Sequence, residues 1–271
     1  MYPENQPPEA GPSIPLSQAS HLLASFTQFL TVCIHNILYY RSLYPAQTFL
    51  TSRAYNLPVH QSRHPRLCSW IRDAVDAVRA QLVLGVVERV AVVIHDGRAR
   101  VMERWMFDVG GFPAWKGVKE GVGGGGGSKG KSRERVGDIV EGVEGRADGT
   151  DGGADGRVNW TDVDEQLRAA VRRLAYAGEK MAPLPEGCTF TVAVELRDEG
   201  EAPIGHPQPW VPTQPNLQTK SKERPEPGED IGGAKTTPLR AVEAGPLFFE
   251  CWVEEGKAKG ELSSTLTSSN E

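Results

Sequence analysis

Two runs of β-branched and aromatic residues around Asp96-Gly97 constrain the fold of this chain more than any other feature. The stretch from Val86 to Val109 reads VVERVAVVIHDGRARVMERWMFDV. Asp-Gly is a favoured pair in a tight two-residue turn, because both central positions of such a turn can adopt positive φ. The sequence therefore predicts a β-hairpin here, inside a sheet that the rest of the chain covers, extends or interrupts.

The two arms of this hairpin differ in their pattern. The first arm, Val90 to Ile94, is apolar at every position, which is typical of a strand inside a sheet with helices on one side. The second arm mixes Trp105 and Phe107 with charged residues such as Glu103. This mixture predicts a strand nearer to an edge of the sheet.

Three stretches carry apolar residues at helical spacing. The first runs from about Ser17 to Tyr44 and is apolar over much of its circumference. The second opens at His64-Pro65, where proline occupies a first helical position that it tolerates well. The third runs from about Thr161 to Met181, and Thr161 with Asp164 weakly matches a capping box.

Further apolar or alternating runs predict strands that would extend the sheet. These runs are Cys188 to Leu196, Thr237 to Val242 and Leu247 to Val253. Between the first two helices, the stretch from Ala46 to Val59 is short and mixed, with a turn or extended link at Asn56-Leu57-Pro58. Helices that cover an antiparallel sheet give an α+β fold class.

Low-complexity stretches delimit a single domain. Residues 117–158 are rich in glycine, residues 212–235 are rich in proline, and the tails at 1–15 and 256–271 have no apolar period. Such compositions bury too little apolar surface to offset the entropy of ordering, so we expect disorder there. The ordered domain is expected to lie within residues 16–255, and residues 197–255 form its distinctive last part.

Charge and hydropathy exclude several classes of function. Lys and Arg number 30 against 35 Asp and Glu, a net charge of -5 without a long basic block, so direct nucleic-acid binding is not expected. Leu22 to Tyr40 is uncharged and long enough to span a membrane, but polar residues such as Gln28 and Asn36 favour a helix buried in a soluble core. Four cysteines without a CxxC pair are expected to be free thiols: Cys33, Cys68, Cys188 and Cys251.

The stretch GGGSKGKS at Gly125 to Ser132 satisfies the phosphate-loop expression GxxxxGK[ST]. A working phosphate loop leaves a buried strand and enters a helix whose N-terminal amides hold the phosphates. Neither the glycine run before this stretch nor Arg133 to Gly145 after it forms such an element. We therefore expect a chance match in a low-complexity linker, and a nucleotide-dependent enzyme is the least favoured function.

Other candidate ligands and catalytic groups fail on spacing. Asp148, Asp151 and Asp155 lack the alternating oxygens and the terminal Glu of an EF-hand loop. His60 and His64 precede a helix and do not share one of its faces. No local Ser-His-Asp or Cys-His arrangement stands out. The sequence predicts no catalytic residue, cofactor or metal.

A family resemblance goes further than these patterns. The stretch from Phe29 to Asp73 holds its marks: Ile37-Leu38-Tyr39, Tyr44-Pro45, Tyr55-Asn56-Leu57-Pro58-Val59 and His64-Pro65. The likeness resumes at Val86 to Val109, Val163 to Leu196, Pro209-Trp210 and Pro238 to Glu255. These residues resemble the small HORMA-domain subunits of DNA polymerase zeta, the B form of the mitotic arrest deficient-like proteins. The Gly-rich insertion and the lengthened run from Pro203 to Lys235 depart from the family pattern.

The resemblance implies a HORMA fold, in which three helices pack on an antiparallel sheet and a mobile C-terminal safety belt follows. In such proteins the belt closes over an extended partner peptide that pairs with a sheet edge. The implied protein is a nuclear, non-catalytic adaptor in translesion synthesis. It would join a Pro-containing peptide of the polymerase zeta catalytic subunit to the deoxycytidyl transferase scaffold. The alternative is a checkpoint or chromosome-axis HORMA protein with another peptide client.

The resemblance also implies contact residues. Those for the partner peptide are Trp70, Trp210, Tyr55 and Pro212. Those for a HORMA homo- or heterodimer are Arg168 and Arg172, and those for the scaffold are Thr236, Pro238, Glu250 and Trp252. Trp70 lies about 60° from Leu67 around its helix, at the margin of the inner stripe. Trp70 could instead serve only to pack the core. Arg168 could belong to an ordinary solvated helix face. The scaffold residues could be part of a strand with a purely structural role.

Overall fold

The computed structural model describes residues 16–112, 158–197, 210–220 and 224–261. The phosphate-loop match and the three aspartates considered as calcium ligands lie outside these residues. The helices are α1 (Leu16–Tyr40), α2 (Pro65–Leu84) and α3 (Trp160–Lys180), with short 3-10 turns η1 (Ala46–Thr48) and η2 (Pro215–Leu217). The strands are β1 (Phe49–Ala54), β2 (Leu57–Ser62), β3 (Val87–His95), β4 (Val101–Asp108), β5 (Thr189–Leu196), β6 (Lys235–Ala244) and β7 (Leu247–Glu255).

A five-stranded antiparallel sheet forms the body of the fold, in the order β5-β3-β4-β7-β6. The hairpin expected from the sequence is β3-β4, with Val92 opposite Trp105. The expected C-terminal strands are β6 and β7, which pair with each other and reach the sheet through β7 and β4. The expectation that β4 lies nearer an edge was wrong, because β4 is the central strand.

The charged residues of β4 explain this error, since they are buried in ion pairs. Glu103 is fully buried and lies 2.8 Å from Arg41. Arg104 is 4% exposed, lies 2.9 Å from Glu254 and also pairs with Glu195. A buried charge is tolerated when it is paired and hydrogen-bonded. These partners are distant in the sequence, so local alternation could not reveal them.

The turn between β3 and β4 is longer than the two-residue turn that Asp-Gly suggested. The N–H of Asp96 donates to Arg100 O at 3.0 Å, and the N–H of Ala99 donates to Asp96 O at 3.0 Å. The left-handed residue is Ala99, with φ of 60°, and Gly97 does not adopt positive φ. Asp96 acts instead through its carboxylate, which accepts the N–H groups of Arg98 and Arg100 at 2.9 Å.

The helix ends follow the sequence with small shifts. The start of α2 is confirmed, since His64 caps it by accepting the Leu67 N–H at its Nδ1, 3.4 Å away. The cap of α3 is Asn159, whose Oδ1 accepts the Asp162 N–H at 3.3 Å, and not Thr161. The first helix, α1, ends at Tyr40, four residues earlier than expected.

A second, two-stranded sheet begins within the stretch from Ala46 to Val59, where the sequence indicated only a short, mixed segment with a turn or extended link. Strands β1 and β2 pair along their whole length, from Phe49 opposite Ser62 to Ala54 opposite Leu57. Their connection consists of Tyr55 and Asn56, which adopt φ of 51° and 56°. Positive φ at both positions is the geometry of a type I′ hairpin turn. Glycine usually marks such a turn in a sequence, but neither turn residue is glycine here.

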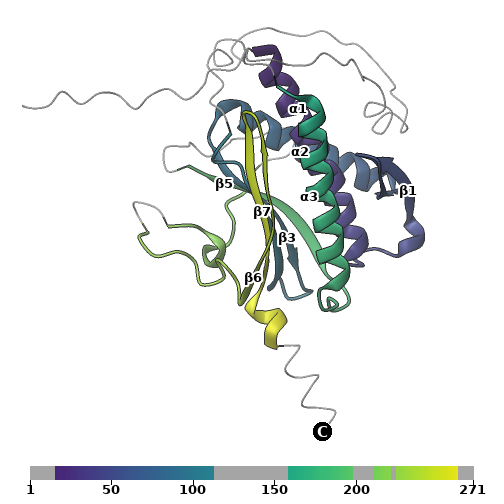
Figure 1. Ribbon diagram of the computed structural model, residues 1–271. Helices are drawn as coiled ribbons and strands as arrows, with labels where there is room; N and C mark the ends of the chain where they lie inside the picture. The colour runs from purple at the N-terminus through teal and green to yellow at the C-terminus, as the bar shows by residue number, and fades with distance from the viewer. Residues whose placement is uncertain (1–15, 113–157, 198–209, 221–223, 262–271) are drawn as a thin grey trace, which may run out of the picture.

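The helices lie together on one face of the large sheet, with α1 between α2 and α3 (Figure 1). Aromatic rings join the layers, because Phe29 of α1 lies 6.0 Å from Phe107 of β4 and 5.3 Å from Phe249 of β7, between ring centroids. By length and hydropathy α1 could cross a membrane. Here two-thirds of its most apolar window is buried inside the fold, in agreement with a core helix.

Two stretches expected to be disordered contain residues with defined places. Residues 257–261 form a helical turn after β7, and Lys259 in this turn is buried. Within 212–235, Leu217 of η2 is 5% exposed and packs against the sheet. The described fold therefore extends beyond residue 255, and part of the Pro-rich run packs against it.

Candidate functional site

Strand β5 is an outer strand of the large sheet. It pairs with β3 on one side, from Thr189 opposite His95 to Leu196 opposite Val87, and no other described strand pairs with it. Most of its residues are half-buried, in contrast to the buried central strand β4. An outer strand with unpaired backbone groups is a template for another extended chain.

Trp70 of α2 stands beside this edge. Its ring lies 5.0 Å from that of Phe190 on β5, between centroids, in an edge-to-face arrangement of 80°. Trp70 is half-buried, so it contacts the core and still presents part of its surface. The marginal position expected on α2 is confirmed, and its neighbour Phe190 was not among the expected site residues.

The chain then crosses from one edge of the sheet to the other. We call residues 197–234, between β5 and β6, the crossing segment. Since β5 and β6 are the two outer strands, this segment must span the width of the sheet. Figure 1 shows its light-green part, which holds η2, on the side of the sheet away from the helices.

Leu217 anchors the crossing segment on that second face. It packs in an apolar cluster with Val93 of β3 and with Val101 and Met106 of β4. Near its end the segment pairs with β7, as the Gly232 N–H donates to Glu254 Oε2 at 3.1 Å and the Ala234 N–H donates to Glu255 O at 2.7 Å. These contacts hold the part after residue 210 against the sheet.

Two expected peptide contacts lie in this segment. Trp210 is half-buried and packs against the main core. Pro212 is exposed, and its neighbour Val211 is 77% exposed. The structure thus gives Trp70 and Trp210 partly buried aromatic surfaces against the same core, while Pro212 points to no described partner.

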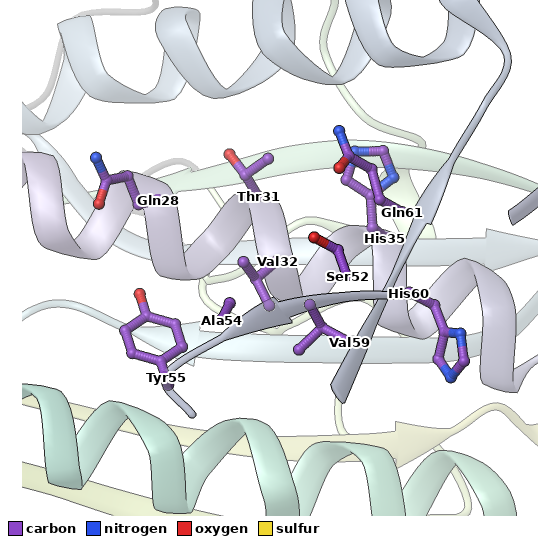
Figure 2. Close-up of a pocket in the computed structure, with 10 residues that line it drawn as sticks. All are labelled: Gln28, Thr31, Val32, His35, Ser52, Ala54, Tyr55, Val59, His60 and Gln61. Atoms are coloured by element: carbon purple, nitrogen blue, oxygen red, sulfur yellow. The ribbon is translucent and has the colours of Figure 1, made fainter. Parts of the chain in front are cut away.

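Tyr55 lies elsewhere, in the turn between β1 and β2 (Figure 2). It is 7% exposed, and burial raises the pKa of its hydroxyl. It lies in the β1-β2 hairpin beside α1, whereas Trp70 belongs to α2 and contacts β5. The structure does not bring Tyr55 to the β5 edge, because the left-handed turn folds it under the hairpin.

Tyr55 instead closes one end of a small cavity between α1 and the β1-β2 hairpin, of about 30 Å³. The cavity is mostly apolar and is lined on α1 by Thr31, Val32 and His35 (Figure 2). A space of this size holds about one water molecule. It is too small for a cofactor, and it lies away from the edge strand.

The expected scaffold residues share one surface of the β6-β7 hairpin. Pro238 pairs with Trp252 in the register, so their side chains lie on one face, with Glu250 two residues along β7. Thr236 and Pro238 are exposed, and Trp252 is half-buried. Phe248 continues the same row and is 40% exposed. Sequence reasoning missed it, although its alternation with the buried Phe249 was a usable signal.

The expected dimer residues, Arg168 and Arg172, lie on the outward face of α3. They line a wide groove of about 800 Å³ together with Arg173, Tyr176 and Arg240. Arg168 lies 3.5 Å from Glu165, which is a solvent-exposed pair. The groove is strongly basic, although the chain as a whole is acidic.

Two further features of the described part of the chain concern metal ligands and thiols. There, no group of three His, Cys, Asp or Glu side chains could hold a metal ion. All four cysteines are free thiols, as expected. Burial, with a further contribution from Cys251, raises the pKa of Cys33 well above its ordinary value, so this thiol is unreactive.

Comparison with known proteins agrees with this architecture. The HORMA domain profile matches residues 23–236. The DNA polymerase zeta processivity subunit of Schizosaccharomyces pombe is 30% identical over 230 residues, which cover 85% of this chain and 91% of that protein. The human mitotic spindle assembly checkpoint protein MAD2B is 25% identical over 238 residues, or 86% and 90% of the two chains.

Solved structures share the fold at lower identity. A chain of the mitotic checkpoint complex superposes with a TM-score of 0.57 at 19% identity, over 88% of this chain and 98% of that one. Caenorhabditis elegans HTP-2 bound to the HIM-3 closure motif gives 0.52 at 13%, over 90% and 92%. The profile match, the relatives and the shared sheet with its helical layer together identify the chain as a member of the HORMA-domain family.

Proposed function

We propose that this chain is a non-catalytic adaptor subunit of DNA polymerase zeta in translesion synthesis, acting in the nucleus. It captures an extended, Pro-containing peptide of the catalytic subunit and links it to the deoxycytidyl transferase scaffold. One observation carries this proposal. The chain leaves the outer strand β5, crosses the sheet and rejoins it at the opposite edge, so a peptide paired with β5 can be enclosed by the crossing segment.

Peptide capture would combine backbone pairing at β5 with enclosure by the crossing segment. The unpaired edge of β5 offers N–H and C=O groups to any extended chain, which gives affinity with little sequence dependence. Trp70 and Phe190 add an aromatic surface at this edge, and aromatic anchors commonly supply much of the binding energy. Enclosure by the crossing segment acts mainly on the dissociation rate, because the segment must open before the peptide leaves.

The choice of client rests on the relatives. Proteins named as processivity subunits of DNA polymerase zeta match along most of this chain, in fission yeast and in Arabidopsis thaliana. The structures of the mitotic checkpoint complex and of HTP-2 are less than 20% identical and support the fold alone. A polymerase zeta peptide is therefore the favoured client over a checkpoint or chromosome-axis peptide.

The outer surface of the β6-β7 hairpin is the proposed contact for the scaffold. Pro238, Trp252 and Phe248 provide apolar contact area there, beside Thr236 and Glu250. This surface faces away from the helices, whereas the proposed peptide edge is at the other side of the sheet. Both partners could thus be bound at once, as a bridging role requires.

The groove on α3 is the proposed HORMA-to-HORMA contact, and its charge favours a heterodimer. A symmetric dimer would place Arg168, Arg172 and Arg173 near the same residues of the second copy. Like charges brought together at an interface cost binding energy. A partner face rich in carboxylates would complement the groove, and no membrane or nucleic acid is needed for this role.

Replacement of Trp70 tests the peptide edge. We expect Trp70→Ala to weaken binding of overlapping 20-residue peptides from the polymerase zeta catalytic subunit by about 2 kcal/mol or more, roughly 30-fold, because it removes the anchor beside β5. Fluorescence anisotropy with labelled peptides measures this change. The matched control is Trp160→Ala, because the Trp160 ring packs beside that of His21, 3.8 Å away between centroids, and not at that edge.

The same peptide panel separates the two client classes. Binding of polymerase zeta peptides by the wild type and by Trp160→Ala, but weakly by Trp70→Ala, is the expected result. Preference for checkpoint or axis peptides would favour the alternative client. Equal affinity of Trp70→Ala and the wild type would remove Trp70 from the site.

A further inference from the structure

The last described turn of the chain, residues 257–261, is tied to the interior by a buried lysine. Lys259 is 4% exposed, although lysine is rarely buried unless it is paired. Its Nζ lies 2.6 Å from Glu103 Oε1 and 2.7 Å from Glu255 Oε2. Glu103 belongs to β4 and Glu255 to β7, so one ammonium joins two neighbouring strands.

Arg41, just after α1, completes this group. Its Nη2 lies 2.8 Å from Glu103 Oε1 and its Nε lies 3.0 Å from Oε2, while its Nη1 donates to Gly178 O of α3 at 2.8 Å. Trp105 Nε1 also donates to Glu103 Oε2, at 3.1 Å. We call Arg41, Glu103, Glu255 and Lys259 the Glu103 cluster. Its two cations balance its two carboxylates, which makes burial of the charges tolerable.

If the β6-β7 hairpin separated from β4, the Glu103 cluster would be divided into two parts. Arg41 and Glu103 precede the crossing segment and would stay paired if the β6-β7 hairpin left β4. Glu255 and Lys259 would leave with the hairpin. Within the cluster, Lys259 is therefore the charge that fastens the hairpin and the last turn to the remaining fold.

The backbone before Lys259 directs the turn onto the core. The Gly256 N–H donates to Met102 O at 2.8 Å and continues the pairing of β7 with β4. A Cβ at Gly256 would lie 2.1 Å from Val101 O, so this close approach requires glycine. Ala258 then packs against the main core. The turn is thus held by backbone, apolar and ionic contacts at one end of the hairpin.

We propose that Lys259 is a positioning residue that latches the β6-β7 hairpin to β4 and so sets how often the hairpin separates from the sheet. Burial alone would raise the pKa of Glu255, but hydrogen bonds and charges from Lys259 and Lys235 lower it. Glu255 therefore stays ionised opposite the ammonium at neutral pH. The consequence for peptide lifetime rests on the proposed function, whereas the latch itself does not.

Amide hydrogen exchange on the full chain without peptide tests the latch. In Lys259→Met, Glu103 and Glu255 lose a shared cation, so we expect the opening equilibrium of the β6 and β7 amides to rise about 100-fold, or about 2.8 kcal/mol. Amides that join β3 to β5 should keep their wild-type exchange. This contrast separates release of the hairpin from general loss of stability.

Two lysines provide matched controls. Lys257 is in the same turn but is exposed, and its Nζ donates to the carbonyl of Glu229. Lys235 is the other partner of Glu255, at 3.3 Å, with 69% of its side chain exposed. Lys257→Met and Lys235→Met should each raise β6 and β7 exchange less than threefold.

Other outcomes decide against the latch. Unchanged β7 exchange in Lys259→Met, or an equal rise in every strand, would overturn it. If Lys259→Met fails to fold, Lys259→Gln keeps a donor toward Glu103, and an increase confined to β6 and β7 is required of it as well. Failure of the wild type to bind polymerase zeta peptides would instead contradict the proposed function and leave the exchange result standing.

Discussion

His35 shows how one residue of α1 depends on the small hairpin above it. The side chain is 4% exposed, and its Nδ1 accepts the Ser62 N–H at 3.4 Å, so this nitrogen carries no proton. Burial lowers the pKa of His35 to about 4, because the imidazolium would lose its hydration. The neutral ring is therefore the form that packs between α1 and β2.

This shift predicts how stability depends on pH. The unfolded chain binds a proton at His35 near pH 6.5 and the folded chain only near pH 4. The contribution of neutral His35 is thus complete above pH 6.5 and is lost as the pH falls to 4, by up to about 3 kcal/mol. We expect the free energy of unfolding, measured with urea, to fall less between pH 7 and pH 4.5 in His35→Gln than in the wild type. Burial lowers the pKa of His60 as well, but less, so His60→Gln should retain most of the wild-type loss, and equal losses in all three proteins would contradict the assignment.

Single residues were predictable from the sequence where local geometry decides them. His64 caps α2, and Trp70 lies at the margin of its helix, because spacing alone fixes both positions. Tyr55 could not be placed in this way, since its φ of 51° depends on the hairpin that it closes. Phe190 became recognisable as part of the edge only when α2 and β5 were brought together.

At the scale of elements, the described residues of the crossing segment, 210–220 and 224–234, place two large apolar side chains against the fold: Trp210 against the main core and Leu217 on the sheet. Around it, the Gly228 N–H donates to Gln218 O at 2.9 Å and the Asp230 N–H donates to Asn216 O at 3.0 Å. These bonds join the described residues on the two sides of 221–223, and Leu217 packs this part of the segment against the sheet. Elements with few buried contacts open at low free energy, as a closing segment requires.

Leu217 therefore offers a test of how firmly the segment is closed. Leu217→Ala should remove about 2–5 kcal/mol of local stabilisation, the usual range for a buried leucine, and raise the dissociation rate of a bound polymerase zeta peptide at least tenfold. Surface plasmon resonance measures the rate. Val211→Ala, at a residue 77% exposed, should leave it unchanged. A wild-type rate in Leu217→Ala would show that η2 does not restrain the peptide.

The elements themselves were largely predictable from periodicity, and their arrangement was not. Apolar spacing located α1, α2, α3 and the five strands of the large sheet to within a few residues. The place of β4 was missed because Arg104 and Glu103 find their partners more than 60 residues away. The β1-β2 hairpin was missed because its turn contains no glycine. Local rules describe pairs of neighbours in the sequence, and these features depend on contacts between distant segments.

At the scale of the whole molecule, peptide capture and scaffold contact are proposed for opposite sides of one sheet. The order β5-β3-β4-β7-β6 places the free strand edge at one end and the β6-β7 hairpin at the other. Arg104 connects them, because it pairs with Glu195 on β5 and with Glu254 on β7. The crossing segment and the Glu103 cluster both hold the C-terminal part against the sheet, in the position from which we propose that it encloses a peptide at the β5 edge.

The dissociation rate of a captured polymerase zeta peptide, before and after the crossing segment is cut, tests this enclosure most directly. A specific protease site would be inserted at residues 221–223 and, as the control, at Gly126 in the Gly-rich stretch between β4 and α3. We expect cleavage at 221–223 to raise the rate at least tenfold, because the peptide no longer waits for the segment to open, and control cleavage to leave it unchanged. An unchanged rate after cleavage at 221–223 would contradict enclosure of the peptide.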